Sequence, residues 1–272
     1  MTQHRIGIEG NGFLTEQIKK SLRELPIDRA ALAAVVTSTI EFANKLARDL
    51  PVYWPHETPQ ERQKVIALAL LIRLVEIVES ILILSAFGVR QELKTLFRVF
   101  LDAYFLIANV CSDPEFVAIY FRTDEPERLK LLNVAARQDH ELFSAVREYA
   151  SDEIRENLDK QIKDEQIQAF NSHLFANNVA CGHIYDSMYR LSSPSVHSGP
   201  RCLAEYINAD QEGNVLSIRH TGDEETTGSV LYDTEVFLLQ ALTGVCELFG
   251  LPHVDELGKL RASVEAAMTE AK

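Results

Sequence analysis

The sequence predicts an all-α fold: a helical bundle with two long central apolar helices and a small β-hairpin inserted before the penultimate helix. Apolar residues recur at helical spacing through most of the 272 residues, and only nine prolines and twelve glycines interrupt them. Hydrophobic residues make up 46% of the chain, which argues against long disordered tracts. We therefore expect one compact core with additions.

Residues 1–56 are expected to form a helical pair that packs on this core. Helical spacing covers residues 13–24 and 28–49, and Pro26 separates the two stretches. Asp28 is of a residue type that caps helix N-termini, so the second helix is expected to begin there.

Two long apolar helices follow and form the centre of the predicted bundle. Thr58 and Glu61 have the spacing of a capping box ahead of the first, which is predicted over residues 65–87. Gly88 breaks the pattern, and the second apolar helix is predicted over residues 90–111. So short a break predicts that the two helices pair antiparallel.

The core of the predicted bundle is placed at residues 57–250, and its outer helices are more charged. Helical spacing continues over residues 114–122, 126–149 and 152–180, each with one apolar stripe. Such helices are expected to cover the central pair. A further helical pattern at residues 184–191 lies in a segment rich in Gly, Ser, Pro and His.

A β-hairpin is predicted at about residues 203–219. Two extended runs, 203–208 and 214–219, flank a turn that contains glycine. An apolar helix is then predicted over residues 230–249, and a polar amphipathic tail helix within residues 251–272.

The composition narrows the function classes. A formal net charge of −13 opposes general attraction to nucleic acid, because phosphate binding depends on Lys and Arg. A chain with this net charge can still contain a local basic pocket. The four cysteines form no C-x-x-C pair and no secretory leader is recognisable, so we expect reduced thiols and a cytoplasmic protein. The eight histidines lack metal-binding spacing and no phosphate-binding loop is present, so we expect neither a metal nor a cofactor.

No membrane-spanning helix is expected. The most apolar stretch, residues 65–89, is interrupted by Arg73, Glu76 and Glu79. A span needs roughly 20 consecutive apolar residues. We therefore interpret this stretch as a buried helix.

The segment from Tyr185 to Gly199 is the part of the sequence that looks most like a chemical site. An imidazole at His197 can transfer a proton near neutral pH, and the guanidinium of Arg190 can hold a phosphate through paired hydrogen bonds. Together they supply what metal-independent phosphodiester cleavage requires. Alternatively, the serines cap a helix while His197 packs against the bundle. The segment also contains the substrate-binding candidates Tyr189, Ser192, Ser193 and Ser195.

A second polar group lies on the apolar helix at residues 90–111. Arg98 and Asp102 are four residues apart and can form an ion pair on one helix face. This stripe faces either solvent or a polar pocket, where the two side chains could orient His197 or bind an anion. Alternatively, the pair belongs to an ion-pair network that only fixes helix register. The stripe continues through Gln91, Thr95 and Asn109, and Arg73, Glu76 and Glu79 of the preceding helix could complete the pocket.

The spacing of Arg190, six intervening residues and His197 resembles the R-x(4–6)-H motif of the HEPN superfamily (higher eukaryotes and prokaryotes nucleotide-binding). The wider pattern also resembles an uncharacterised bacterial family that we associate with this superfamily. That pattern includes Tyr185, Tyr189, Leu191-Ser192 and Val196-His197, with Leu96-Phe97-Arg98-Val99-Phe100-Leu101-Asp102 far upstream. The resemblance covers roughly residues 60–250.

The resemblance implies a helical domain of a kind that includes many metal-independent RNases of toxin–antitoxin, CRISPR and anti-phage systems. In such domains the Arg and His of two subunits face each other across a dimer interface. Carried over, Arg190 would stabilise the phosphate and His197 would be the general acid or base. The chain departs from the family pattern at Leu191, where active members usually have a polar residue, and at Pro194, which would make the motif bend around a helix start.

Two hypotheses follow. In the first, the protein is a HEPN-like RNase of a toxin or defence type that works as a homodimer, with RNA as substrate and an antitoxin or other protein as partner. Arg190 and His197 should then face a shared groove with positive potential. In the second, the protein is a non-catalytic helical module that binds a protein or small ligand. His197 should then be buried and saturated by intramolecular hydrogen bonds.

Overall fold

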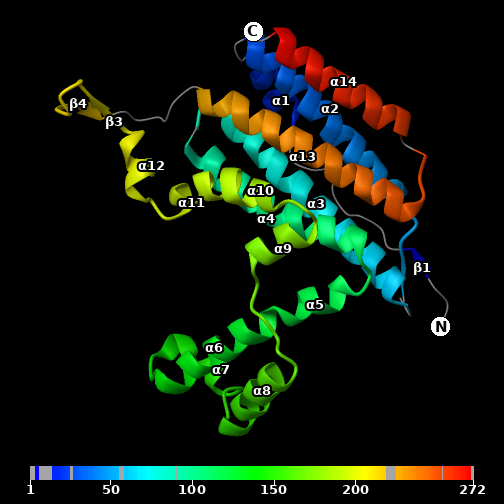
Figure 1. The fold of residues 1–272 in the computed structure, drawn as a ribbon, viewed down its shortest axis with the longest axis vertical. Helices are drawn as coiled ribbons and strands as arrows, with labels where there is room; N and C mark the ends of the chain where they lie inside the picture. Colours follow the sequence, from blue (N-terminus) through cyan, green and yellow to red (C-terminus); the bar gives the residue numbers. More distant parts are fainter. Residues whose placement is uncertain are drawn as a thin grey trace.

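The all-α bundle with a small antiparallel hairpin is confirmed (Figure 1). In the main bundle, α2, α3, α4 and α13 pack side by side, and α1 and α14 lie against them. These helices are α1 (Glu16–Arg23), α2 (Ile27–Asp49), α3 (Pro59–Ala86), α4 (Gln91–Ser112), α13 (Glu225–Phe249) and α14 (Val254–Glu270). The computed structural model describes residues 4–5, 14–24, 27–54, 58–89, 91–218, 225–252 and 254–270.

The two central apolar helices are α3 and α4, and they form the most extensive helix–helix contact of the described chain. The predicted capping box is present: the Glu61 amide donates to Thr58 Oγ1 over 3.2 Å, and the Thr58 amide donates to Glu61 Oε2 over 3.0 Å. Gly88 follows α3 at φ +70°, a conformation that glycine adopts without strain. The chain therefore reverses between the two helices as expected.

Helix α4 is the one described helix with the length and apolarity that crossing a membrane requires. However, 56% of its most apolar window is buried inside the bundle. Phe100 and Phe105 are fully buried there. Its apolar character is thus explained by its place at the centre of the core.

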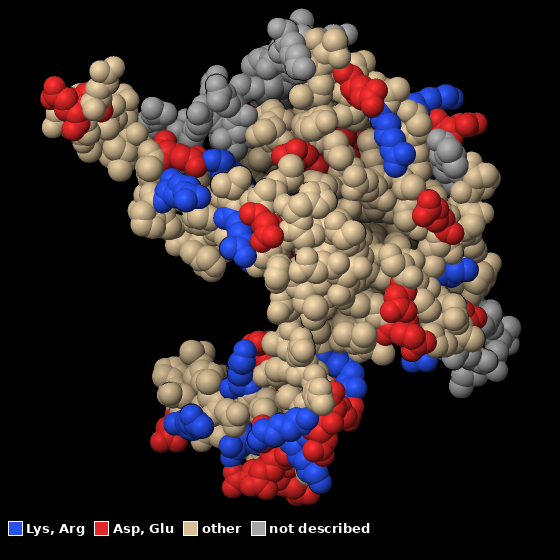
Figure 2. Space-filling view, viewed as in Figure 1, with Lys and Arg blue, Asp and Glu red and all other residues tan. Residues whose placement is uncertain are grey.

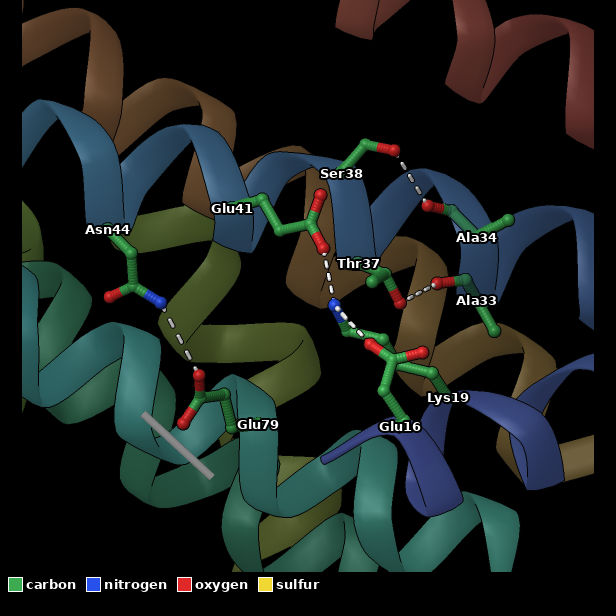
Figure 3. A network of polar contacts seen from close by, with 9 residues as sticks. All are labelled: Glu16, Lys19, Ala33, Ala34, Thr37, Ser38, Glu41, Asn44 and Glu79. Atoms are coloured by element: carbon green, nitrogen blue, oxygen red, sulfur yellow. Dashed lines mark hydrogen bonds and ion pairs between the residues drawn. The ribbon is translucent and has the colours of Figure 1, made fainter. Parts of the chain in front are cut away.

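The N-terminal helical pair packs on the core through both apolar and polar contacts. Lys19 of α1 donates to Glu41 of α2 over 2.7 Å and lies 3.6 Å from Glu16 (Figure 3). Asn44 of α2 donates to Glu79 of α3 over 3.5 Å in the same region. These contacts join α1, α2 and α3, whose packed faces are otherwise apolar.

The expectation that the outer helices cover the central pair is wrong for residues 124–164. These residues form a lobe that projects from the main bundle and packs mainly on itself (Figure 1). The lobe has its own small core around Leu132, Ala135 and Ala150. It contains α6 (Asp124–Arg137), the 3-10 helix η1 (Glu141–Phe143), α7 (Ser144–Arg147) and α8 (Asp152–Asp164), and α5 (Phe116–Arg122) connects it to the bundle.

The two longest predicted outer helices are also each interrupted. The stretch predicted at 126–149 ends at Gln138, where the backbone becomes extended. The stretch predicted at 152–180 is broken after α8, where Gln166 has φ +52°, and resumes at α9 (Ser172–Asn178). The Asn171 side chain accepts the Leu174 amide over 3.1 Å and caps this new helix. Local capping therefore overrides the helical period.

The hairpin is present, with a shorter first strand than predicted. Strand β3 (Ile207–Ala209) pairs with β4 (Val215–Ile218), and Ile207 lies opposite Ile218. The residues just before β3 form a short helix, α12 (Pro200–Ala204), because Pro200 at its first position favours a helix start. A second, unpredicted pair joins β1 (His4–Arg5) to β2 (Tyr53–Trp54).

Candidate functional site

The segment that carries the R-x(6)-H spacing is one helical stretch from residue 182 to 196. It begins as α10 (Gly182–Ile184), widens into the π-helix η2 (Tyr185–Tyr189) and continues as α11 (Arg190–Val196). Pro194 lies inside α11, so the expectation that the motif bends around a helix start is wrong. The π-helical turn lies directly before Arg190, and such turns are frequent at functional sites.

Helix α11 ends in a Schellman-type turn. The Gly199 amide donates to the Pro194 carbonyl over 2.9 Å, and Ser198 adopts the left-handed conformation with φ +48°. His197 is the C-cap residue of this turn. The turn thus holds the backbone of His197 in place while leaving its side chain exposed.

Arg190 and His197 are both exposed. The Arg190 side chain is 64% exposed, and its Nε lies 3.2 Å from Oδ1 of Asp186, which is itself 62% exposed. Within the part of the chain that the structure describes, no hydrogen bond or ion pair involves the His197 side chain. The condition set by the second hypothesis, a buried and saturated His197, is therefore not met.

Arg98 and Asp102 form the ion pair expected from their spacing, and Arg98 also contacts Tyr189, a partner in the pocket that the sequence did not suggest. Arg98 Nη1 donates to Asp102 Oδ2 over 2.8 Å, and Arg98 Nη2 donates to the Tyr189 hydroxyl. The Tyr189 hydroxyl donates to Ser172 Oγ over 3.0 Å, and Ser172 Oγ donates to Asp102 Oδ1. The four side chains therefore form a closed ring of hydrogen bonds.

Ser172 and Tyr189 of this ring are buried, and Arg98 and Asp102 are half-buried. The Arg98 guanidinium lies 4.5 Å from the centre of the Tyr189 ring, which permits a cation–π contact. Burial raises the pKa of the Tyr189 hydroxyl, the hydrogen bond with Ser172 lowers it, and the negative charge of Asp102 raises it. The phenol therefore stays protonated and keeps its place as a donor within the ring.

Polar residues along α4 hold the segment that follows the lobe. Asn109 donates to the Phe175 carbonyl over 2.8 Å, and Gln91 donates to the Cys202 thiol over 2.9 Å. Lys94 donates to Glu205 over 2.6 Å. The polar side chains of this helix face thus point toward protein, and they hydrogen-bond to the segment that follows the lobe.

The other residues proposed for the pocket have different surroundings. Arg73 pairs with Glu76 over 2.7 Å on the exposed side of α3, and Glu79 is approached by Asn44 of α2. These contacts lie within α3 and between α2 and α3, and they include no residue of the Arg98 ring. The contacts of Arg73, Glu76 and Glu79 thus give no support to the suggestion that they complete the pocket.

The serines of the motif lie within α11. Ser192 Oγ donates to the Met188 carbonyl over 2.8 Å, and Ser193 Oγ donates to the Tyr189 carbonyl over 2.9 Å. Ser195 is half-buried. Since the first two hydroxyls bond their own helix, they neither cap a helix start nor point freely toward a substrate.

The comparison with family models matches residues 64–215 to a family of unknown function, DUF5677. This chain belongs to the DUF5677 family. No curated protein and no solved structure matches the chain.

The DUF5677 match includes the whole candidate site. It runs from early in α3 through the lobe and α9 to the start of β4, so Arg98, Ser172, Tyr189, Arg190 and His197 all lie inside it. Helices α1, α2, α13 and α14 lie outside it, although α13 packs directly on α4. The family model thus covers the site but only part of the bundle that supports it.

Two residues of this DUF5677 site are not identified from the sequence. Ser172 completes the hydrogen-bond ring, and His173 lies with its ring centre 4.8 Å from that of Tyr185. Both lie at the start of α9, inside a stretch predicted as the middle of a long helix. The cap at Asn171 is the signal that could have located this helix start and thereby the two residues.

No metal site is evident in the described part of the chain. Among those residues, no group of three or more His, Cys, Asp or Glu side chains is placed to hold an ion. The four cysteines, at positions 111, 181, 202 and 246, are unpaired. The candidate site contains the imidazole of His197, the guanidinium groups of Arg98 and Arg190 and the phenols of Tyr185 and Tyr189.

Proposed function

We propose that this DUF5677 protein is a HEPN-like, metal-independent RNase of a toxin or defence type that works as a homodimer. Arg190 binds the scissile phosphate and His197 is the general acid or base. The observation that carries the proposal is the presentation of both side chains, exposed, by one short helix. The resemblance of the R-x(6)-H spacing to the HEPN motif supplies the reaction class.

The helix geometry suits a shared task. Residues seven apart on an α-helix are separated by about 10 Å along the axis and by nearly two full turns, so they point in similar directions. Arg190 is held by an exposed ion pair with Asp186, and such pairs contribute only about 0–1 kcal/mol. An incoming phosphate can therefore replace Asp186 at little cost.

The chemistry needs a cation that binds the phosphate, a base and an acid, and in the homodimer Arg190 and the His197 side chains of two protomers supply them. The ribose 2′-oxygen attacks the adjacent phosphorus while a base takes its proton, and the P–O5′ bond breaks as an acid protonates the leaving oxygen. The products are a 2′,3′-cyclic phosphate and a 5′-hydroxyl. His197 of one protomer performs one of the two proton transfers and the partner's His197 performs the other, while Arg190 stabilises the charge that develops on the phosphate oxygens.

A second copy of the chain fits this arrangement. Leu191 and Val196 flank the two candidate residues on α11, and they are 63% and 36% exposed. A partner subunit that packed against α11 would cover them and bring a second Arg190 and His197 nearby. An antitoxin could use the same exposed surface.

The test is RNA cleavage by the purified protein in EDTA, with wild type compared to Arg190→Ala and His197→Ala. We expect each substitution to reduce the cleavage rate by about 100-fold or more. His183→Ala, at an exposed histidine of α10, is the matched control and should cleave like wild type. Circular dichroism of all variants checks that they are folded, and a wild type that cleaves no RNA of a broad panel would refute the proposal.

A non-catalytic binding module is the second candidate. The closed ring of Arg98, Asp102, Ser172 and Tyr189 favours it, because these four side chains hydrogen-bond to one another, which is what a structural role requires. If wild type cleaves no RNA, the search moves to protein partners of the exposed apolar residues on α11, α12 and the hairpin.

A further inference from the structure

A series of ring contacts leads from the interior of the site to its surface. The guanidinium of Arg98 lies over the Tyr189 ring. The Tyr189 ring stacks on the Tyr185 ring, with centres 4.6 Å apart and planes 21° apart. The Tyr185 ring in turn contacts the ring of His173, with centres 4.8 Å apart and planes 43° apart. Tyr189 is buried, Tyr185 is half-buried and His173 is exposed. We call Tyr189, Tyr185 and His173 the aromatic series.

The aromatic series is held rigidly at its inner end. The Tyr189 hydroxyl bonds to both Arg98 and Ser172, and Ser172 directly precedes His173 in α9. The same hydrogen-bond ring therefore fixes η2, which carries the two tyrosines, relative to α9, which carries the histidine. A preorganised surface of this kind loses little entropy when a flat ligand binds to it.

Arg190 lies beside the outer part of the series. Its guanidinium carbon is 5.6 Å from the centre of the Tyr185 ring, and its side chain is 64% exposed. A cation next to an aromatic surface that is half-buried at Tyr185 and exposed at His173 suits a ligand that combines a flat ring with a negative charge. A nucleotide has both, with the base available for stacking and the phosphate for pairing with a guanidinium.

We propose that His173 and Tyr185 form a stacking site for an unpaired base of single-stranded RNA whose phosphate is held by Arg190. The inference rests on the proposed function for the role of Arg190 and adds the base-binding residues. Duplex RNA is excluded from the site because its base faces are covered by their neighbours. The strong net negative charge of the chain, −13, means that such local contacts must supply the affinity.

The test is binding of a fluorescently labelled single-stranded RNA, followed by anisotropy in EDTA. The RNA is 2′-O-methylated throughout, so that it cannot be cleaved during the measurement. We expect His173→Ala and Tyr185→Leu each to weaken binding by about tenfold. His173→Trp, which restores a large flat ring, should bind at least as tightly as wild type. Tyr149→Leu, at a 66% exposed tyrosine of the lobe, is the matched control and should change nothing.

An oligonucleotide with abasic residues distinguishes stacking from charge. The wild-type protein should bind the abasic oligonucleotide about as weakly as His173→Ala binds the intact RNA. The affinity of His173→Ala for the abasic oligonucleotide should be no lower than that of wild type. Equal losses on the intact and the abasic oligonucleotide would overturn the stacking site, and so would unchanged binding of His173→Ala to the intact RNA.

The two proposals fail in distinguishable ways. Cleavage by wild type together with unchanged RNA binding by His173→Ala overturns the stacking site alone. Base-dependent binding without cleavage by wild type supports the stacking site and overturns the nuclease. If wild type neither binds nor cleaves RNA, both are overturned.

Discussion

The burial of one side chain, Glu235, is expected to make the stability of the fold depend on pH. Glu235 lies on α13, is fully buried and accepts a hydrogen bond from Thr39 of α2. Its second carboxyl oxygen is buried without a hydrogen-bond partner among the described residues. Burial raises the pKa of Glu235 to about 7, and the Thr39 hydrogen bond opposes this shift. The folded protein therefore keeps a proton that the unfolded chain has already lost near pH 6.

We predict that Glu235→Gln stabilises the protein at pH 8 and has little effect near pH 4. Because the folded pKa lies above the unfolded value, the wild-type free energy of unfolding should fall as pH rises from about 4.5 to about 7. The loss is on the order of 3 kcal/mol at most, and the amide removes it.

Urea denaturation at both pH values measures this difference. Glu265→Gln, at an exposed position of α14, is the control. A variant that is less stable than wild type at pH 8 would contradict the prediction, because it would mean that the buried carboxylate is stabilising.

At the scale of elements, the segment between the lobe and the hairpin depends on local signals. Asn171 begins α9, a π-helical turn precedes Arg190, and Ser198 ends α11 in the left-handed conformation. None of these elements is long, so their helices are stabilised mainly by docking on α4. The candidate site therefore depends on the correct start and end of several short helices.

We predict that Asn171→Ala destabilises the protein by about 1 kcal/mol, because the Leu174 amide loses its side-chain acceptor. Since Ser172 and His173 follow directly, RNA binding should weaken as well. Asn178→Ala, at the exposed end of the same helix, should have a smaller effect on both. Thermal unfolding and the anisotropy assay check the two effects, and equal losses in both variants would argue against a specific cap.

At the scale of the whole molecule, the lobe and the hairpin both project from the main bundle. Figure 2 shows a hollow between the bundle and the lobe, and the hairpin projects on the same side of this view. The hairpin exposes Val215, Leu216 and Ile218 by 60%, 64% and 68%. A two-stranded hairpin is at best marginally stable alone in water, so these apolar residues are suited to contact with another chain.

We predict that the protein sediments as a dimer of about twice 30.6 kDa and that Ile218→Asp shifts it toward the monomer. A charge at this position would have to be desolvated in the dimer but remains hydrated in the monomer. Leu142→Asp, at an 83% exposed position of the lobe, is the matched control. Sedimentation equilibrium measures both, and a wild-type monomer at high concentration would contradict the prediction.

Much of the fold follows from local patterns in the sequence. The capping box at Thr58, the break at Gly88 and the apolar period on both sides of it predict α3 and α4, and both helices form as expected. The Arg98–Asp102 pair also follows from spacing alone, since residues four apart share a helix face. Such signals depend only on residues within one helix and not on the elements that pack against it.

The lobe and the aromatic series could not be predicted in the same way. A charged helix with one apolar stripe looks the same whether it covers α3 and α4 or packs on other short helices in a lobe. The ring that joins Ser172 to Asp102, and the contact of His173 with Tyr185, connect residues on separate elements. Their meeting depends on where α9 begins and how η2 docks on α4.

The sequence by itself determined the helical class, the central apolar pair, the hairpin and the spacing of Arg190 and His197. Only the tertiary structure decided that residues 124–164 leave the bundle, that His197 is exposed, and that Arg98 and Tyr189 share a closed hydrogen-bond ring. The physical reason is that periodicity and capping depend on residues within one helix, so they predict where that helix begins, where it ends and which face is apolar. Contacts between distant side chains are set by the packing of the whole chain.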